Sequence, residues 1–206
     1  MRLYYRPGTG RPFRPAWALE EIGIPYEAVA VTSEEAAGEE YRARQPLGRV
    51  PTLEDDQGNC LFESAGLVIH IGDQHPDSGL MRALGDPDRG RIYQWSFAAM
   101  TELEPPLVQF LLNAQSNPEL AAAGATKFAD SAQAFEQALK GREYLVGDSL
   151  TAADIVLAGV LLIARLGQQL EGLPILTAYL DRLRPRPAFQ KALVVTESLL
   201  RDAGAV

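Results

Sequence analysis

Few side chains in this sequence are of the types that bind metals or act as nucleophiles. Cys60 is the only cysteine, and the two histidines, His70 and His75, lie five residues apart near Asp73. A lone thiol cannot form an internal disulfide, and no cysteine–histidine cluster has the spacing of a zinc site. We therefore interpret Cys60 as a buried small hydrophobe and the histidines as solvated or capping side chains. A metal site at the histidines is the weaker alternative, and we predict no metal.

The most distinctive local pattern lies at residues 148–155 (DSLTAADI). With Thr151 as the N-cap, its hydroxyl accepts from the backbone N–H of Asp154, whose carboxylate accepts from the Thr151 N–H. Residues 155–163 are apolar on every side, so we expect a buried helix whose first turn needs internal partners. The pattern is therefore interpreted as structural rather than catalytic.

Composition and charge exclude several classes of protein. The 206 residues include 27 acidic and 19 basic side chains, which gives a formal net charge of −8. A general nucleic-acid binder needs a basic surface, so no nucleic-acid partner is expected. The first residues lack the apolar core of a signal peptide, and no apolar run is long enough to span a bilayer. We therefore expect a cytoplasmic protein without a membrane partner.

The first 75 residues alternate between strand and helix patterns. Residues 3–5 suit a strand, residues 13–22 carry apolar side chains at helical spacing, and residues 26–31 suit a second strand. A strand, a helix and a parallel strand make a βαβ unit. Residues 33–45 are polar and predict either a solvated helix or an ordered loop.

A β-hairpin is predicted next, with strands at 50–54 and 60–62 around a polar turn. Ser64 then precedes a run of apolar residues at helical spacing, and we expect it to be the N-cap of that helix. The hairpin therefore leads directly into a helix, which ends near His75.

After residue 85 only helical patterns remain. Pro105 and Pro106 lie inside the first helical stretch and predict a kink, because a proline removes a backbone donor and clashes with the preceding turn. Besides the buried helix after Thr151, helices are expected at 91–113, 118–140, 173–183 and 188–200.

Five segments of the sequence resemble the cytosolic glutathione S-transferase family, and they occur in that family's order. Residues 45–53 (QPLGRVPTL) resemble its NPxGKVPxL segment, and Glu63-Ser64 matches its ES motif. The remaining segments are similar to its active-site strand and loop, its first helix and second strand, and the cap of its second domain: residues 3–9 (LYYRPGT), 18–27 (ALEEIGIPYE) and 149–154 (SLTAAD).

The resemblance implies a two-domain architecture of the α+β/all-α type. A thioredoxin-like N-terminal domain with the order βαβαββα would precede an all-helical C-terminal domain. We place the first domain at residues 1–76, a linker at 77–86 and the helical domain at 87–206. The resemblance also implies a homodimer that binds the tripeptide glutathione, mainly through the N-terminal domain.

The resemblance assigns three parts of glutathione binding to named residues. Ser64, near a helix start, would hold the γ-glutamyl carboxylate, because N–H groups and the helix dipole favour an anion there. Glu63 would receive the α-ammonium of the ligand or, alternatively, a nearby arginine. Val50, followed by a cis Pro51, would pair its backbone with the cysteinyl part of glutathione like an added strand.

The glycine carboxylate of glutathione has no evident partner in the sequence. The family often places a basic residue shortly before the NPxG segment, where this chain reads GEE at residues 38–40. Arg42 and Arg49 are the candidate substitutes.

Activation of the glutathione thiol is assigned by the resemblance to the loop after the first strand. The thiolate is the nucleophile, and a hydroxyl donor lowers the pKa of the thiol. In the serine-using classes the hydroxyl follows Tyr-Tyr-x-Pro-Gly, where this chain has Thr9. Arg11 adds positive charge, and Tyr4 and Tyr5 are competing hydroxyls. Gly10 stands where cysteine-using bacterial classes carry their cysteine, which disfavours mixed-disulfide chemistry on a protein thiol.

The acceptor substrate is expected to bind between the two domains. Phe13, Met100 and Glu104 are the candidates for its wall, and Met100 and Glu104 share one face of the long helix. Phe97 lies on that face as well but is interpreted as core. Glu102 or Glu104 is an alternative partner for the glutathione ammonium of a second subunit.

Three functions fit these residues. The preferred one is a glutathione transferase for detoxification, in which the thiolate of bound glutathione attacks an electrophilic small molecule without a metal. The second is a glutathione-dependent disulfide or peroxide reductase that uses the same pocket. The third is a non-catalytic glutathione-binding interaction module, since one fold can carry several functions.

Overall fold

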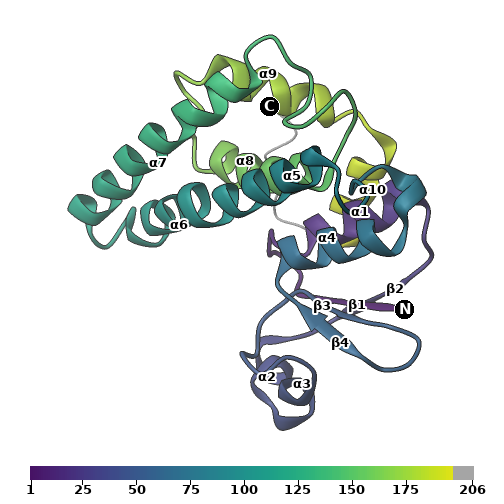
Figure 1. Ribbon diagram of the computed structural model, residues 1–206. Helices are drawn as coiled ribbons and strands as arrows, with labels where there is room; N and C mark the ends of the chain where they lie inside the picture. Colours follow the sequence, from purple (N-terminus) through teal and green to yellow (C-terminus); the bar gives the residue numbers. More distant parts are fainter. Residues whose placement is uncertain (197–206) are drawn as a thin grey trace.

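A four-stranded mixed sheet forms the N-terminal part of the computed structural model, which describes residues 1–196 (Figure 1). The sheet order is β2-β1-β3-β4. β1 runs parallel to β2 and antiparallel to β3, and β3 pairs with β4 as a hairpin. The strands are β1 (Arg2–Tyr5), β2 (Glu27–Ala30), β3 (Thr52–Glu54) and β4 (Cys60–Phe62). The predicted βαβ unit and hairpin are thus confirmed.

Helices and the loops between them make up the rest of the described chain. Two of the helices have non-α geometry: η1 is a 3-10 helix and η2 is a π-helix. In chain order they are α1 (Phe13–Ile22), α2 (Ser33–Ala37), α3 (Glu39–Arg44), α4 (Ser64–Gln74), η1 (Pro76–Ser78), α5 (Pro87–Ala98), η2 (Ala99–Leu103), α6 (Glu104–Asn113), α7 (Pro118–Leu139), α8 (Ala152–Leu166), α9 (Pro174–Leu183) and α10 (Pro187–Val195). The expected combination of a thioredoxin-like domain and an all-helical domain is confirmed.

Different helices cover the two faces of the sheet. Leu3 packs into the main core with α1 and α4, whereas the next residue, Tyr4, packs on Tyr41 of α3. Successive side chains of a strand point to opposite faces, so β1 needs an apolar cover on both. In Figure 1, α1 and α4 lie between the sheet and the helical domain, while α2 and α3 lie beyond the sheet. The polar segment 33–45, predicted as helix or loop, forms these two short helices.

The long helix predicted at 91–113 is interrupted just before its prolines. α5 ends at Ala98, the π-helical turn η2 follows, and α6 begins with Pro105 and Pro106 in its first turn. Prolines are tolerated there because the first N–H groups of a helix have no intrahelical acceptor. The expected kink therefore takes the form of a π-helical turn and a new helix start.

α8 is buried along most of its length, and one carboxylate organises its beginning. Asp154 accepts four hydrogen bonds of 2.8 Å, from the Leu145 N–H, the Thr151 N–H, the Thr151 hydroxyl and the Tyr179 hydroxyl. The expected capping box at Thr151 is present. Asp154 thus connects the loop before α8, the first turn of α8 and α9, which supports the structural interpretation of this motif.

The C-terminal helix α10 packs against α1 of the N-terminal domain. The Phe189 ring lies 4.9 Å from Phe13 and 4.8 Å from Trp17, measured between ring centroids. Arg186 also forms an ion pair with Glu21 of α1. α10 ends at Val195, and residues 197–200 of the predicted helix lie outside the described residues. The domain boundaries at 76 and 87 stay predictions.

Two side chains expected in the core are not buried there. Phe97 is 58% exposed on α5, and Cys60, in the edge strand β4, is only partly covered.

Within residues 1–196 no helix combines the length and apolar character needed to cross a membrane. The same part of the chain contains no cluster of three His, Cys, Asp or Glu residues suited to a metal ion.

Candidate functional site

A cavity of about 620 Å³ opens where the loop after β1, the segment before β3, the start of α4 and the η2–α6 junction meet. Apolar side chains from the helical domain, Met100, Pro105 and Val108, form one side of its lining. The predicted glutathione residues all lie on the lining: Thr9, Arg11, Arg49, Val50, Pro51, Glu63 and Ser64. Of the predicted acceptor residues, Met100 and Glu104 also line it.

Phe13 does not belong to this cavity, so its assignment to the acceptor wall is wrong. Its side chain is fully buried and packs between Trp17 and Phe189. Phe13 is the first residue of α1, and the direction of its side chain is set by the packing of α1 on α10. This distant contact is not visible in the spacing of the local sequence.

The Glu63-Ser64 pair lies at the entry to α4. Glu63 has a φ of 74°, a left-handed conformation that is rare for non-glycine residues and that recurs at functional sites. Ser64 is the first helical residue rather than the N-cap, and its side chain caps no backbone N–H. Instead its hydroxyl accepts a hydrogen bond of 2.9 Å from Arg14 Nη1. The N-cap prediction for Ser64 is therefore wrong by one residue.

Glu104 lies beneath the cavity between two arginines. It accepts a hydrogen bond of 2.6 Å from Arg11 Nε and another from Arg14 Nη2. Burial alone would raise the pKa of Glu104, but the positive charges of Arg14 and Arg11 outweigh it and lower the pKa. Glu104 is therefore ionised at neutral pH and fixes both guanidinium groups.

Arg14 is not among the residues predicted from the sequence, although one feature of the sequence marks it. It is an arginine within a helix segment (FRPAWAL) that is otherwise apolar, and it is fully buried. A buried guanidinium requires partners, and Ser64 and Glu104 supply them for Nη1 and Nη2, whereas Nε has none among the described residues. Arg14 thus lies behind the cavity wall and joins α1 to α4 and α6.

Thr9 directs its hydroxyl at its own loop in this structure. The Thr9 hydroxyl donates to the Arg6 carbonyl at 2.7 Å, and the Thr9 N–H contacts the same carbonyl at 3.2 Å. Both bonds hold the turn that follows β1. To donate to a bound thiolate, the hydroxyl has to turn away from Arg6.

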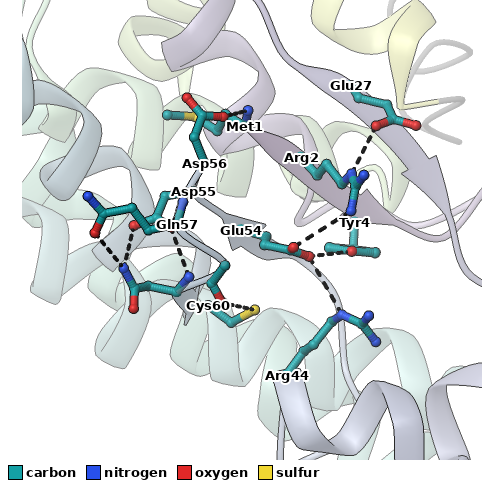
Figure 2. Close-up of polar contacts among 12 residues, drawn as sticks. Met1, Arg2, Tyr4, Glu27, Arg44, Glu54, Asp55, Asp56, Gln57 and Cys60 are labelled. Atoms are coloured by element: carbon teal, nitrogen blue, oxygen red, sulfur yellow. Dashed lines mark hydrogen bonds and ion pairs between the residues drawn. The ribbon is translucent and has the colours of Figure 1, made fainter.

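Tyr4 is not positioned to donate to the glutathione thiol, because its hydroxyl points away from the cavity. Figure 2 shows it beside Glu54, together with Arg2 and Arg44. Burial and the neighbouring Glu54 carboxylate raise the pKa of Tyr4. Tyr5 is buried and does not line the cavity either.

Positive charge is in excess around the cavity. Arg6 and Arg49 line it, and within the described residues neither forms an ion pair. The buried Nε of Arg6 also has no hydrogen-bond partner there. With Arg11 and the underlying Arg14, four arginines stand against two carboxylates. Arg42, the other candidate for the glycine carboxylate, instead binds the carbonyls of residues 37 and 46.

Hydrogen bonds to α3 and within the segment itself hold the chain between α3 and β3. The Val50–Pro51 peptide bond is cis, as predicted. The Tyr41 hydroxyl donates to the Arg49 carbonyl at 2.8 Å, and the buried Gln45 side chain accepts from the Leu47 N–H at 2.6 Å. Gln45 and Gly48 line the cavity but were not predicted as site residues.

Two family models match this chain. Residues 1–71 match the glutathione S-transferase N-terminal domain, and residues 99–187 match the glutathione S-transferase C-terminal domain. A solved structure described as a ternary complex of BphK, a bacterial GST, is 32% identical, with a TM-score of 0.85 and coverage of 99% of this chain and 100% of that one. The protein is a cytosolic glutathione S-transferase family member.

Other members of the glutathione S-transferase family resemble the chain over its full length. Glutathione S-transferase GstA of Escherichia coli O157:H7 is 28% identical over 197 residues, which cover 94% of this chain and 97% of that protein. A sphingomonad glutathione S-transferase, solved in complex with glutathione, is 31% identical with a TM-score of 0.82 and full coverage of both chains. The family likeness therefore extends across both domains.

Proposed function

We propose that this protein is a glutathione transferase in which the thiolate of bound glutathione attacks an electrophilic small molecule. One observation carries the proposal: a single cavity combines the Glu63-Ser64 helix start and Val50 with the apolar side chains Met100 and Val108. A peptide that carries a thiol and an apolar acceptor then meet in the same space. Membership of the glutathione S-transferase family supports this reading.

Each polar part of glutathione has a suitable partner on the cavity wall. The γ-glutamyl carboxylate fits Ser64 at the start of α4, and the α-ammonium fits Glu63. The cysteinyl part lies along Val50. For the glycine carboxylate we propose Arg49 together with Arg6, because neither has a carboxylate partner within the described residues.

The charge of the cavity favours the reactive form of the thiol. Glutathione with an ionised thiol carries two carboxylates, one thiolate and one ammonium, which is an excess of two negative charges. The four arginines and two carboxylates of the site provide the matching positive excess. Nearby positive charge lowers the pKa of a thiol, and we propose that Thr9 adds a hydrogen bond to the thiolate.

The acceptor is proposed to be small and largely apolar. Met100, Pro105 and Val108 supply the apolar wall, and the unbranched thioether of Met100 adapts to differently shaped partners. The π-helical turn η2 carries Met100 and ends where α6 begins at Glu104. A turn of this kind is frequent at functional sites.

The decisive experiment follows the thiol of bound glutathione. Ultraviolet difference absorbance of the protein–glutathione complex is recorded from about pH 5 to pH 9, around the free thiol pKa of about 8.5. The transferase proposal predicts ionisation at least one pH unit lower and turnover of an activated aryl halide. Binding without any shift of the thiol pKa, and without turnover of halides, disulfides or peroxides, overturns it.

The second candidate is a glutathione-binding module without turnover. It is favoured by the hydrogen bond from the Thr9 hydroxyl to the Arg6 carbonyl and by glycine at position 10. In that case glutathione binds with an unshifted thiol pKa, and Thr9→Ala changes neither affinity nor rate. The same titration therefore separates the two candidates.

We also propose that the protein acts as a cytoplasmic homodimer. Several large apolar side chains are exposed on the single chain, among them Leu47, Phe62 and Phe97. The glutathione S-transferase resemblance implies a homodimer, and exposed large apolar side chains are candidates for the contact surface between its subunits. Light scattering on the purified protein tests this proposal, and a monomer at all concentrations contradicts it.

A further inference from the structure

The guanidinium of Arg14 forms hydrogen bonds to residues of both domains. Nη1 donates to the Ser64 hydroxyl at 2.9 Å, and Nη2 donates to Glu104. Ser64 belongs to the proposed glutathione site, whereas Arg14 does not line the cavity. A fully buried arginine with this placement acts on the ligand only through its partners.

The hydrogen bond to Arg14 determines the role left to Ser64. A guanidinium has only donors, so the Ser64 oxygen must be the acceptor. A hydroxyl has a single hydrogen, and among residues 1–196 no protein group accepts that of Ser64. Ser64 lines the cavity although only 2% of its surface is exposed, so a ligand in the cavity is the remaining candidate acceptor for its hydrogen.

Arg14 itself has little freedom to move. Glu104 holds one side of the guanidinium, and the backbone of α8 lies against the other at Gly159. A Cβ atom on Gly159 would lie 2.6 Å from Arg14 Nε and 2.8 Å from its Cγ. The missing side chain of Gly159 is therefore what gives the Arg14 side chain its room.

We propose that Arg14 is a positioning residue that orients the Ser64 hydroxyl as a donor to the γ-glutamyl carboxylate of glutathione. The inference rests on the proposed function and deepens its account of the same site. Without Arg14, the Ser64 hydrogen is free to turn away and its oxygen faces the carboxylate. The helical domain, through Glu104 and Gly159, thereby controls an anion site in the other domain.

A double-mutant cycle tests whether Arg14 acts through Ser64. Glutathione affinity is measured by calorimetry for the wild type, Arg14→Met, Ser64→Ala and the double variant. We expect each single variant to weaken binding about tenfold, the effect of losing an oriented hydrogen bond to a charged group. In the Ser64→Ala background, Arg14→Met is expected to change the affinity less than twofold.

A second ligand isolates the carboxylate in question. The probe is a glutathione analogue that lacks the α-carboxylate of its γ-glutamyl residue. The wild type and Arg14→Met should bind this analogue with the same affinity, because it lacks the carboxylate to which the Ser64 hydroxyl would donate. If Arg14→Met does not fold, Gly159→Ala carries the same cycle, since it displaces the Arg14 side chain and keeps the charge that faces Glu104.

The matched control is Arg186→Met. Arg186 also forms an ion pair on α1, with Glu21, but it lies outside the cavity lining. The Arg186→Met variant should lower the free energy of unfolding without changing the affinity for glutathione.

The outcomes separate this inference from the proposed function. No binding of glutathione to the wild type overturns the proposed function, and this inference with it. Normal wild-type binding, together with equal losses for Arg14→Met in both backgrounds and for both ligands, overturns only the role of Arg14. Such a result would make Arg14 a purely structural residue.

Discussion

Thr9 and Ser64 place two hydroxyls on one cavity. The Thr9 hydroxyl donates a hydrogen bond to the protein, whereas the Ser64 hydroxyl accepts one. The Thr9 hydrogen is used within its loop, on the Arg6 carbonyl, whereas the Ser64 oxygen accepts from Arg14 and leaves its hydrogen available. At the residue scale, then, Ser64 is ready for an anion before glutathione arrives. Thr9 has to exchange an internal bond for a bond to the thiolate.

Replacing Thr9 by valine measures that exchange. Thr9→Val removes the hydroxyl and keeps the β-branched shape. We expect the pKa of the bound thiol to rise by about one unit and kcat/KM below that pKa to fall about tenfold, with little change in glutathione affinity. Difference absorbance and steady-state kinetics check this. Ser64→Ala is the contrasting variant, because it should weaken the affinity for glutathione instead. An unchanged thiol pKa in Thr9→Val would show that Thr9 does not activate the thiol.

Glu104 should make stability depend on acid pH. Its pKa in the folded protein lies below the ordinary value of 4.5, because Arg14 and Arg11 outweigh the effect of burial. A lowered pKa stabilises the fold above the ordinary value, and this contribution is lost as the pH falls through the folded pKa. The unfolding free energy of the wild type should therefore exceed that of Glu104→Gln at pH 6, and the difference should shrink below pH 4.5.

Urea unfolding from about pH 6 to pH 3 measures this difference. Exposed Glu119→Gln serves as the control and should follow the wild type throughout. A gap between wild type and Glu104→Gln that stays constant with pH contradicts the assignment.

The residues that could be predicted are those whose role follows from local sequence. Val50, Glu63 and Thr9 belong to short motifs, and the structure brings them to one cavity. Arg14 and Phe13 follow each other in the chain, yet one serves the site and the other the core. Their roles depend on α10, Ser64 and Glu104, which are far away in the sequence, so spacing alone does not reveal them.

At the scale of elements, the helices and strands were predictable wherever periodicity or a cap marked them. The buried helix after Thr151 and the hairpin are examples. The π-helical turn η2 was not predicted, because only the packing of the flanking helices separates it from a proline kink. That turn carries Met100 to the cavity, so the missed element is a functional one.

Loss of the Asp154 carboxylate should loosen the start of α8. Asp154→Ala leaves four buried donors without their acceptor and is expected to destabilise the protein by about 4 kcal/mol. Denaturant unfolding measures the change. Asp148→Ala, an exposed neighbour, should stay within about 0.5 kcal/mol of the wild type. An equally small effect at Asp154 would show that water replaces its bonds.

Gly159→Ala tests the control of the site from α8. The added methyl group clashes with the middle of the Arg14 side chain, so this side chain must shift, and we expect its hydrogen bond to Ser64 to weaken. Glutathione affinity should fall several-fold although Gly159 does not line the cavity. The control is Gly90→Ala on α5, where an added Cβ meets no atom within 4 Å and stability should rise by about 1 kcal/mol. Unchanged affinity in Gly159→Ala would show that Arg14 can move without consequence.

At the scale of the whole molecule, the cavity stands out electrostatically. The chain carries a formal charge of −8, but four arginines and two carboxylates surround the site. The surrounding negative charge repels an anionic peptide at long range, and only the local positive excess attracts it. Composition could therefore not reveal this site.

The salt dependence of glutathione binding should distinguish the long-range repulsion from the short-range attraction. Exposed charges more than about 10 Å apart are screened at 0.1 M salt, whereas buried pairs are screened much less. We expect the dissociation rate of glutathione to change less than twofold between about 0.05 M and 0.5 M salt, because short-range contacts govern it. Stopped-flow binding checks this, and a dissociation rate that follows ionic strength steeply would indicate that the arginines act from a distance.

The aromatic contact between α1 and α10 has a consequence for biosynthesis. Phe13 and Trp17 rest on Phe189, which leaves the ribosome long after them. At translation rates of about 5–20 residues per second, the interval is on the order of ten seconds or longer. During that time the apolar side of α1 lacks its final partner, although the sheet beneath it has already been made. The nascent N-terminal domain therefore keeps an apolar surface open to chaperones until α10 has been made.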